Sequence, residues 1–528
     1  MTDVVVIGGG PAGSTAATLL TRAGLDVTVY ERKTFPRPHV GESLLPATLA
    51  ILDDIGVLPL IEAEGFVRKA GATMSWGRTG EPWSWYFRET NRRYPTSFQV
   101  WRPRFDQILL DHSRAVGADV HEGVGVREVL FEDERATGVR LDNGAVVRAR
   151  MVVDASGQQS LAARQLGLKQ WDGFFRNLAL YAYFDDCPHL PPPDDGNIFI
   201  ESAQGGWTWK IPLANNVSSV GAVVDRDAGV RRIREVGRAA YFAEQVAAAT
   251  RTAAMIGDRQ PSGPVTVVRD WSYAASRMTA PGLTLVGDAA CFVDPLFSTG
   301  VHLAVSGAHL AAAQVVSALT DATIAAEAAI AYERLYRTQY EHFHQLARLF
   351  YAGNRSVDSY FWATRRITAE DERSPREAFV RAVSGQTAAG YERSVLSRAE
   401  LPATFDTALT EMQRRPSAPD DIAKASPRLA RGLELIRTAV LGENRFEWGY
   451  AVRGEGRDDV PVSPLVAHLL HNANGQRTIA QIAQAIATEI SRPIAEIQPI
   501  AERATRLLIE DRVLLCEGSA RRAPRSTS

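Results

Sequence analysis

The sequence predicts an α/β fold, and three segments that lie far apart in the chain predict it. The first is a strand from Asp3 to Ile7 that runs into a glycine-rich turn, a helix closed by Gly24 and a second strand ending at Glu31. The second is a strand from Met151 to Gly157, and the third is a strand from Gly282 to Val286 that enters a long alanine-rich helix. Strands alternating with helices build parallel sheets covered by helices. The segments therefore predict one Rossmann-like domain assembled from discontinuous pieces.

Length and composition exclude several classes of protein. The chain has 528 residues, is 45% hydrophobic and 23% charged, and balances 59 Lys+Arg against 61 Asp+Glu. This length predicts two to four domains with a large buried core. The balance of charge excludes a disordered chain, a coiled coil, a collagen-like fibre and a protein held on nucleic acid by bulk positive charge. We expect an ordinary globular protein.

The cysteines and the apolar segments bear on location. Three cysteines are spread across more than 300 positions without metal-ligand spacing, so we expect a reducing, cytoplasmic compartment and no metal. The N-terminal apolar run has no basic region before it, unlike a signal peptide. Pro295 to Thr320 is long enough to span a bilayer but contains two histidines, so we interpret it as a buried helix with its entry loop.

The first strand is followed by GGGPAG, a G-x-G-x-x-G turn with an acid about 20 residues further on. Glycines let the backbone approach a pyrophosphate, the helix N-terminus faces its negative charge, and Glu31 can accept ribose hydroxyls. The alternative is a plain glycine-rich turn in an α/β protein. The residues predicted to bind the dinucleotide here are Gly8, Gly10, Ala12, Gly13, Glu31 and Arg32.

A second cofactor segment decides between dinucleotides. The third strand runs into GDAACFVDPLFSTG, where Asp288 can take a ribityl or ribose hydroxyl and the following helix dipole can face a flavin ring. NAD in a simple dehydrogenase would not need this segment, so the sequence favours FAD. The residues predicted to bind the rest of the FAD are Asp154, from the Met151–Gly157 segment, and Gly287, Asp288, Pro295 and Gly300.

Six motifs together resemble flavin-dependent halogenases: GGGPAG, PRPHVGESLLP, VWRPRFDQILL, VVDASG, GWTWKIP and GDAACFVDPLFSTGVHLA. They occur in the family's order over roughly residues 1 to 400. They look most like the branch acting on phenolic or pyrrolic rings in natural-product assembly lines, including glycopeptide-antibiotic halogenases. The resemblance implies secondary metabolism, and the discriminating motif is Trp-x-Trp-x-Ile-Pro.

The resemblance also implies a reaction. A separate flavin reductase supplies FADH2, which reacts with O2 to give a C4a-hydroperoxide, and chloride or bromide attacks it to form hypohalous acid. The acid travels inside the protein to a lysine beside the aromatic substrate, and Lys69 in GFVRKAG matches that lysine. Only five of the 59 basic residues are lysine, which adds weight to Lys69. Burial would lower its pKa, whereas the alternative is a surface lysine next to Arg68.

GWTWKIP alternates with period two, which places Trp207, Trp209 and Ile211 on one face and Thr208 and Lys210 on the other. The resemblance implies that Trp207, Trp209, Ile211 and Pro212 form a barrier that keeps the organic substrate away from the flavin. In isolation, such tryptophans are more often simply core residues.

For the halide, the resemblance implies the backbone amides of Ser298, Thr299 and Gly300, in a turn before a helix where dipoles suit an anion. A satisfied helix N-cap is compatible with the same residues. Tryptophan halogenases carry a glutamate just before the matching Ser-Thr-Gly, whereas this chain has Phe297. The difference argues against indole and for a ring activated by its own phenol or pyrrole nitrogen.

Other residues of the motifs have expected places. Arg102 matches the family arginine near the flavin pyrophosphate, and Asp106 is expected to cap a helix. Glu42 and Ser43 are expected to line the ribityl chain or ring edge of the flavin, with a buried salt bridge as the alternative for Glu42. His302 is interpreted as a core histidine and receives no chemistry.

The expected domains are an FAD-binding domain within residues 1–310 (about 1–60, 100–168 and 270–310) and an inserted β-sheet substrate domain (about 61–99 and 169–269). A helical region, 311–400, closes the active site and includes the aromatic run YFWATRR. A linker, 401–428, then leads to a module, 429–528. The module, with three helices and a short strand, loosely resembles winged-helix peptide-chaperone modules. We expect it to dock a carrier protein or peptide, with structural capping as the alternative, since no basic recognition helix supports DNA binding.

Two other functions stay open on the sequence. One is an FAD-dependent aromatic monooxygenase or hydroxylase that uses the same fold without halide. The other is a carrier- or peptide-binding protein with a degenerate flavin site. The sequence does not specify the ring, the position attacked, the halogen or the oligomeric state.

Overall fold

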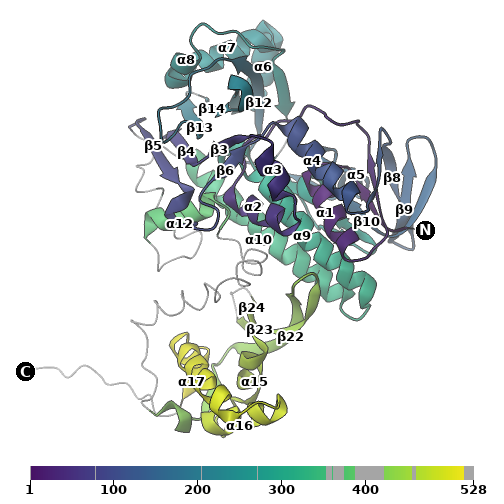
Figure 1. Cartoon of the computed structure of the whole chain (residues 1–528), viewed down its shortest axis with the longest axis vertical. Helices are drawn as coiled ribbons and strands as arrows, with labels where there is room; N and C mark the ends of the chain where they lie inside the picture. The colour runs from purple at the N-terminus through teal and green to yellow at the C-terminus, as the bar shows by residue number, and fades with distance from the viewer. Residues whose placement is uncertain are drawn as a thin grey trace, which may run out of the picture. The chain divides into compact units, whose positions relative to one another are not determined.

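The structure is a computed structural model, and it describes residues 2–77, 79–203, 205–269, 272–352, 360, 374–386, 421–454 and 459–516. The chain divides into two compact units (Figure 1). The first contains Met1–Thr320 and Tyr332–Glu392, and the second contains Asp321–Ala331 and Arg393–Ser528. The active-site motifs all belong to the first unit.

A mainly parallel sheet forms the base of the first unit. At its centre, β1 (Thr2–Ile7) lies between β2 (Val27–Glu31) and β10 (Val146–Asp154), and both neighbours are parallel to it. β19 (Leu283–Leu285) continues the parallel sheet beyond β10, so the three predicted segments meet as expected. The strand order is β18-β19-β10-β1-β2-β7 with the β8–β9 hairpin beside β10; the remaining bounds are Thr279–Ala280 (β18), Asp119–Glu122 (β7), Val126–Glu132 (β8) and Arg135–Leu141 (β9).

Helices cover this sheet and their packing positions the loops. α1 (Pro11–Arg22) follows β1 directly and packs against α4 (Arg102–Ala115) and α9 (Thr299–Thr320). By length and composition, α9 could cross a membrane, but 78% of its most apolar stretch is buried inside the structure, as expected for a core helix. The other helices here are α2 (Pro46–Asp54), α3 (Leu58–Ala63), α5 (Leu161–Gln165), α10 (Ala325–Tyr351) and α12 (Pro375–Val383).

A second sheet contains strands from both segments that the sequence predicts to form a sheet outside the first domain. Its order is β16-β12-β15-β14-β13-β4-β5, so the two segments expected to build it do pair, β13 lying parallel to β4. The strands are Gly71–Ser75 (β4), Pro82–Tyr86 (β5), Asn177–Asp185 (β12), Ile198–Ala203 (β13), Gly206–Pro212 (β14), Val217–Asp225 (β15) and Thr266–Arg269 (β16).

The expectation of strands throughout residues 170–270 is wrong for part of that range. Three helices cover one face of the second sheet (Figure 1): α6 (Arg226–Val236), α7 (Arg238–Ala248) and α8 (Thr250–Ile256). Asp225 caps α6 by accepting the Ala228 N–H at 2.8 Å, a local signal that starts a helix. Beneath these helices the sheet buries Leu178, Leu180 and Val220, so both of its faces are covered.

Short elements complete the first unit. β3 (Val67–Lys69) pairs with β6 (Ser97–Gln99), and β17 (Tyr273–Ala275) lies between β11 (Lys169–Trp171) and β20 (Cys291–Phe292). Single turns of 3-10 helix are Phe87–Glu89 (η1), Gly157–Gln159 (η2), Ala214–Asn216 (η3), Gly287–Ala289 (η4) and Pro295–Phe297 (η5). Of the aromatic run YFWATRR, Tyr360 is buried, and the rest lies outside the described residues.

The second unit contains a hairpin and three helices. The three helices and the short strand that the sequence predicts for this module are α15 (Pro464–Asn472), α16 (Ile479–Glu489), α17 (Ile494–Glu510) and β25 (Leu514–Cys516). The antiparallel sheet of β22 (Leu433–Leu441), β23 (Phe446–Gly454) and β24 (Val460–Val462) was not predicted from the sequence. η7 (Ile422–Lys424) and β21 (Pro427–Leu429) also belong to this unit, and β21 pairs with β25.

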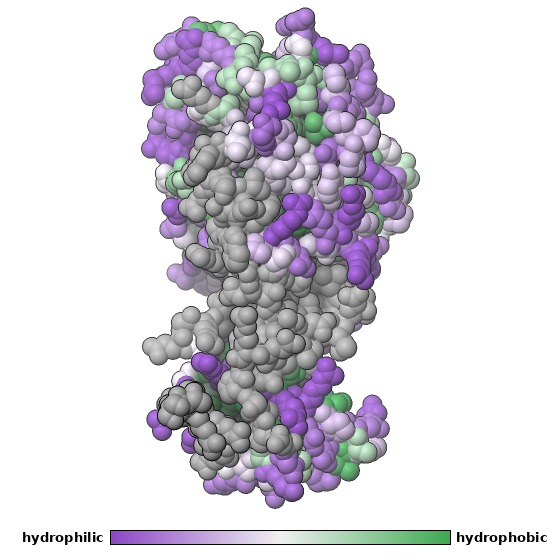
Figure 2. Space-filling view, turned by 90° about the vertical axis from the view of Figure 1, so that its left-hand side faces the viewer, coloured by the Kyte–Doolittle hydropathy of each residue, from purple (hydrophilic) through white to green (hydrophobic). Residues whose placement is uncertain are grey.

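Apolar residues of each unit gather in internal clusters, such as the one that joins α15, α16 and α17. In the view of Figure 2, hydrophilic residues cover most of the described surface, with hydrophobic residues scattered among them. Such scattered apolar residues are normal on protein surfaces.

Candidate active site

The glycine-rich turn brings the backbone close to the N-terminus of α1. A Cβ on Gly13 would lie 1.9 Å from the Gly8 carbonyl oxygen, and Gly8 has a φ of +99°. Side chains are therefore excluded from both positions. Gly10 is the N-cap of α1 and contributes no capping side chain. The first N–H groups of α1 are left for an anion, which fits a pyrophosphate.

Two acids flank this turn, and the structure gives them different tasks. Glu31 at the end of β2 accepts the Gly9 N–H at 2.8 Å, so its carboxylate lies against the turn as a ribose ligand requires. Asp154 is fully buried, and its two oxygens accept the N–H groups of Ser156 and Ala162 at 3.0 and 2.7 Å. Asp154 therefore stabilises the turn that follows β10, next to the predicted cofactor site.

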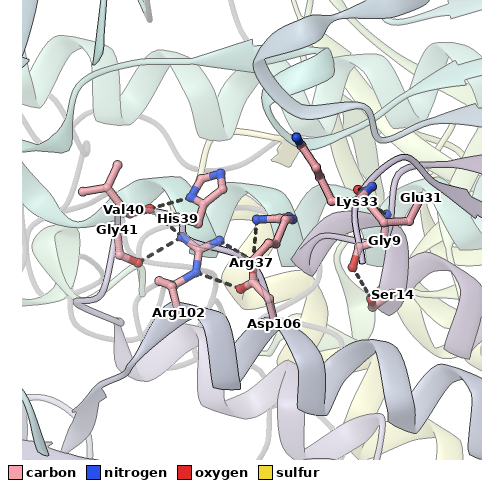
Figure 3. A network of polar contacts seen from close by, with 10 residues as sticks. All are labelled: Gly9, Ser14, Glu31, Lys33, Arg37, His39, Val40, Gly41, Arg102 and Asp106. Atoms are coloured by element: carbon pink, nitrogen blue, oxygen red, sulfur yellow. Dashed lines mark hydrogen bonds and ion pairs between the residues drawn. The ribbon is translucent and has the colours of Figure 1, made fainter. Parts of the chain in front are cut away.

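The segment that follows β2 is held by a buried ion network (Figure 3). Arg102 donates to both oxygens of Asp106 at 2.8 and 3.0 Å and to the carbonyl oxygens of Val40 and Gly41. Burial would raise the pKa of Asp106, but the Arg102 guanidinium outweighs it and the pKa is lowered. Arg102 therefore anchors the loop at residues 40–41, next to the cofactor cradle.

The expectation that Asp106 caps a helix is wrong. The N-cap of α4 is Trp101, and Asp106 sits in the first half of the helix, one turn after Arg102. An aspartate so close to a helix start resembles a cap in sequence, but here the i, i+4 spacing pairs it with a guanidinium.

Arg37 is a site residue that the sequence analysis missed. It also reaches Asp106, at 3.3 Å, and its Nη2 lies 3.2 Å from where a Cβ on Gly10 would be. Its guanidinium therefore faces the glycine-rich turn, where a pyrophosphate would bring negative charge. The signal available in the sequence was a basic residue in the motif PRPHVGESLLP, a few positions beyond the acid of β2.

Asp288 stands in the second cofactor segment, on η4. Its backbone oxygen accepts the Tyr273 hydroxyl at 2.6 Å, whereas in the described part of the chain its carboxylate has no hydrogen-bond partner. Burial raises the pKa of Asp288 to about 6, and the positive charges of Arg102 and Lys169 oppose that rise. The carboxylate is thus available to a cofactor hydroxyl, as predicted. Arg32, by contrast, contacts Gln159 at the surface.

Glu42 and Ser43 are both buried. The Glu42 carboxylate accepts the Tyr183 hydroxyl at 2.9 Å and the Gly41 N–H at 3.0 Å, in place of the salt bridge considered from sequence. Burial raises the pKa of Glu42. His302 is buried on α9 against Phe343, and burial lowers its pKa to about 4, which agrees with a neutral core histidine.

The predicted halide turn leads into α9. Ser298 adopts a left-handed conformation with φ of +58°, and its N–H donates to the Pro295 carbonyl at 3.0 Å. Because that amide is engaged, the amides of Thr299 and Gly300, at the start of the helix, are the ones left for an anion. A Cβ on Gly300 would lie 2.7 Å from the Phe292 ring, so the ring requires glycine at this position.

Lys69 is almost completely buried, with 2% of its surface exposed, so the alternative of a surface lysine is wrong. Its Nζ donates to the Leu44 carbonyl at 3.1 Å and lies 5.3 Å from the centre of the Phe87 ring. Burial lowers the pKa of Lys69 to about 7. A substantial fraction of the amine is therefore neutral near neutral pH, which is the nucleophilic form.

A small cavity joins Lys69 to the halide turn. It offers about 10 Å³ to a water-sized molecule, close to the space that one water needs. Its lining is apolar except for Lys69 and Ser298, and consists of Leu45, Lys69, Ala72, Trp85, Phe87, Ile198, Ile200, Leu296, Phe297, Ser298 and Val383. The cavity therefore places the Lys69 amine and Ser298 on the walls of one small enclosed space.

The tryptophan strand β14 packs as its alternation predicts. Trp207, Trp209 and Ile211 enter the apolar cluster that also contains cavity-lining residues. On the opposite face, Lys210 donates to the Pro188 carbonyl at 2.8 Å. Trp209 lies directly across the sheet from Ile200, which lines the cavity, and Trp207 donates to Tyr351 at 2.6 Å. Pro212 closes the strand.

Comparison with known proteins agrees with this geometry. Residues 3–95 and 88–427 match the family model described as tryptophan halogenase. The chain is 34% identical to a tryptophan 2-halogenase of Chondromyces crocatus over 70% of this chain and 72% of that protein. It is 32% identical to a Pseudomonas fluorescens chlorinase of 1H-pyrrole-2-carbonyl-[peptidyl-carrier protein], over 67% and 84% of the two chains.

Two solved structures are also similar. The myxobacterial chondrochloren halogenase CndH, a variant of FAD-dependent halogenases, has 40% identity and a TM-score of 0.64 over 73% of this chain and 90% of that one. The flavin-dependent halogenase CmlS has 28% identity and a TM-score of 0.70 over 98% and 96%. The chain belongs to the flavin-dependent halogenase family. It is an enzyme that halogenates aromatic substrates in natural-product biosynthesis and uses FAD and a halide.

The residues present fit the flavin. The bare glycine turn, the free N-terminus of α1, the guanidinium of Arg37 and the uncommitted carboxylate of Asp288 are the features that such a cofactor requires. When bound, reduced FAD would supply the electrons that activate O2, and the activated oxygen would oxidise the halide to an electrophilic halogen species. Among the described residues, no group of histidine, cysteine, aspartate or glutamate could hold a metal ion.

Proposed function

We propose that Lys69 carries the electrophilic halogen to an electron-rich phenol or pyrrole ring. The single observation that supports this most strongly is the small cavity lined by both Lys69 and Ser298. Hypohalous acid entering it would meet apolar walls everywhere except at these two residues. The indole rings of Trp207 and Trp209 belong to the apolar cluster that contains most of the cavity-lining residues. They would separate the organic substrate from the flavin.

Each proposed step takes place at the Lys69 amine and conserves atoms and charge. The neutral amine attacks the halogen of hypohalous acid, forming an N–halogen bond and releasing water after proton transfer. The ring then takes the halogen from nitrogen, and the ring proton returns to the amine. The lowered pKa of Lys69, about 7, supports the first step because it supplies the neutral nucleophile. The free amides of Thr299 and Gly300 are the proposed halide ligands.

The choice of ring rests on Phe297. This side chain lines the cavity and packs edge-on against Phe350 at 5.0 Å, so no carboxylate is provided there to accept a ring proton. A phenol or pyrrole is activated by its own heteroatom and needs less help than indole. A carrier-tethered pyrrole is the substrate printed for one relative, and tryptophan is the substrate printed for another.

Partners follow from the same proposal. A separate flavin reductase supplies FADH2, and the second unit docks a carrier protein or peptide that presents the ring. A separate compact unit in which the sheet β22–β24 is followed by the helices α15–α17 supports this docking role. The described cysteines, Cys187, Cys291 and Cys516, are free and buried, which supports a reducing cytoplasmic compartment.

The test is a substrate panel. The purified enzyme is supplied with FAD, a reductase, NADH and O2, first with chloride and then with bromide, and offered phenols, pyrroles and tryptophan in free and carrier-loaded form. Mass spectrometry of the products should show a halogen isotope pattern on phenols or pyrroles, most strongly in carrier-loaded form. Preferential halogenation of tryptophan would overturn the ring assignment, and gain of one oxygen without halogen would instead show a hydroxylase.

A further inference from the structure

The side chain of Lys69 crosses the strand next to its own. In the β3–β6 pair, Lys69 lies opposite Ser97. On the other edge of β6, Ser43 forms a bridge with Gln99, and Leu44 follows it. The segment containing Leu44 is thus two strand spacings, about 10 Å, from β3. Because Nζ of Lys69 donates to the Leu44 carbonyl at 3.1 Å, its side chain must extend over β6.

Three buried oxygen atoms belong to side chains on the face of the strands that the Lys69 side chain crosses. Residues directly opposite one another in antiparallel strands point to the same face, so Lys69, Ser97, Gln99 and Ser43 share one face. Ser43 Oγ, Ser97 Oγ and Gln99 Oε1 are buried, and none of them has a hydrogen-bond partner in the described part of the chain. Buried polar atoms of this kind are uncommon in native proteins, so three on the face that the Lys69 side chain crosses call for a hydrogen-bond partner.

The Lys69 amine has N–H bonds that require hydrogen-bond acceptors. Its nitrogen carries two N–H bonds when neutral and three when charged. Among the described residues, the Leu44 carbonyl is the one hydrogen-bond acceptor assigned to them. A serine hydroxyl reorients by rotation about one bond, so the oxygen of Ser97, a cross-strand neighbour with its Cβ about 5 Å away, can turn toward the Lys69 side chain.

Charged groups on the neighbouring elements are engaged elsewhere. Arg68 is on the opposite face of β3, over the Phe98 ring. Glu89 on η1 pairs with Arg376, and Glu42 accepts from Tyr183. Arg88, the other charged residue of η1, lies over the Tyr86 ring. No other titratable side chain lines the part of the cavity that the structure describes.

We propose that Ser97 positions the Lys69 amine by accepting the N–H bond that Leu44 leaves to the neutral form, with Ser43 or Gln99 accepting the third N–H bond of the charged form, so that the reactive side of the nitrogen faces the cavity. With two N–H bonds fixed on the Leu44 and Ser97 side, the lone pair of the neutral amine is directed toward Ser298 across the cavity. The three are positioning residues because they act through Lys69. The inference rests on the proposed role of Lys69 as the halogen carrier.

The experiment exploits the small number of lysines. The full-length enzyme is labelled with [ε-13C]lysine, which gives signals from five side chains, and the Lys69→Met spectrum assigns the signal of Lys69. The titration midpoint is then measured in the unsubstituted enzyme, in Ser97→Ala, in Ser97→Thr and in Ser113→Ala. Ser113 is the control because it is an equally buried serine whose hydroxyl is already satisfied by the Leu110 carbonyl at 2.7 Å.

An oxygen that accepts from the ammonium stabilises its charged form. Ser97→Ala should therefore lower the Lys69 midpoint by about one pH unit, Ser97→Thr should restore it, and Ser113→Ala should leave it unchanged. Product formed per FADH2 consumed should fall about tenfold in Ser97→Ala alone. Ser43→Ala provides a second variant if Ser97→Ala does not fold.

An unchanged midpoint in Ser97→Ala and Ser43→Ala would overturn the positioning role, even if Lys69 is essential. A shifted midpoint together with a fully active Lys69→Met enzyme would leave the polar contacts standing but remove the halogen-carrier function. The two failures are distinguishable because the midpoint is measured without turnover.

Discussion

Two buried cationic side chains of the first unit, Arg102 and Lys69, have opposite surroundings. Arg102 is surrounded by acceptors: both oxygens of Asp106 and two backbone carbonyls. Lys69 is equally buried and has the Leu44 carbonyl as its assigned acceptor among the described residues. The paired charges of Arg102 and Asp106 stay ionised, whereas burial lowers the pKa of Lys69 to about 7. The fold thus keeps a fixed charge where it anchors a loop and a convertible one where chemistry is proposed.

The largest expected effect on stability comes from breaking the paired site. Asp106→Asn leaves the guanidinium groups of Arg102 and Arg37 buried without their carboxylate, so the free energy of unfolding should fall by about 3–5 kcal/mol. Denaturant unfolding checks the value, and flavin titration should show weaker binding because the loop at residues 40–41 is loosened. The matched control is Glu64→Gln, which removes the partly exposed partner of Arg104 and should cost less than about 1 kcal/mol.

The lowered pKa of Lys69 should affect how the free energy of unfolding depends on pH. The pKa of Lys69 is about 7 in the folded protein and near 10.5 ordinarily, so between these values the unfolded chain binds a proton that the folded chain does not. This group therefore makes stability rise with pH across that window, by about 1.4 kcal/mol per pH unit. Lys69→Met should lack this contribution, so unfolding free energies of the two proteins should converge as the pH rises from 7.5 to 9. Parallel curves would contradict the lowered pKa.

A smaller effect tests the polar contact that joins Tyr183 of β12 to Glu42. Tyr183→Phe removes the hydroxyl that donates to Glu42, so the free energy of unfolding should fall by about 1 kcal/mol and the already raised pKa of Glu42 should rise further. Thermal unfolding measures the first effect. Tyr450→Phe, at an exposed position of the second unit, is the control and should change little.

Local patterns in the sequence predicted the parts of the fold that depend on neighbours in the chain. The β1–turn–α1–β2 unit, the buried helix α9, the alternation of Trp207 and Trp209, and the helices α15 to α17 follow from spacing and glycine positions, and the structure confirms them. The α6–α8 region was mistaken for strands because its aromatic and polar residues were read without its helix period. The β22–β24 sheet was not predicted because buried and exposed residues do not alternate regularly along β22 and β23.

Site residues defined by distant contacts could not be predicted. Arg37 meets Asp106 across nearly 70 positions, and the pairing of Ser97 with Lys69 requires β3 and β6 to be adjacent. Neither relation leaves a periodic signal in the sequence. Lys69 itself was identified through the family motif, and its burial, which sets its chemistry, became visible only in the folded chain.

The most direct test of the proposed role of Lys69 separates oxidation of the flavin from transfer of the halogen. Lys69→Met and the unsubstituted enzyme are given equal FADH2, O2 and bromide, and two rates are measured side by side: consumption of FADH2 and formation of brominated product. The account predicts unchanged FADH2 consumption with product formation reduced at least about a thousandfold. Equal product yields from the two proteins would contradict it.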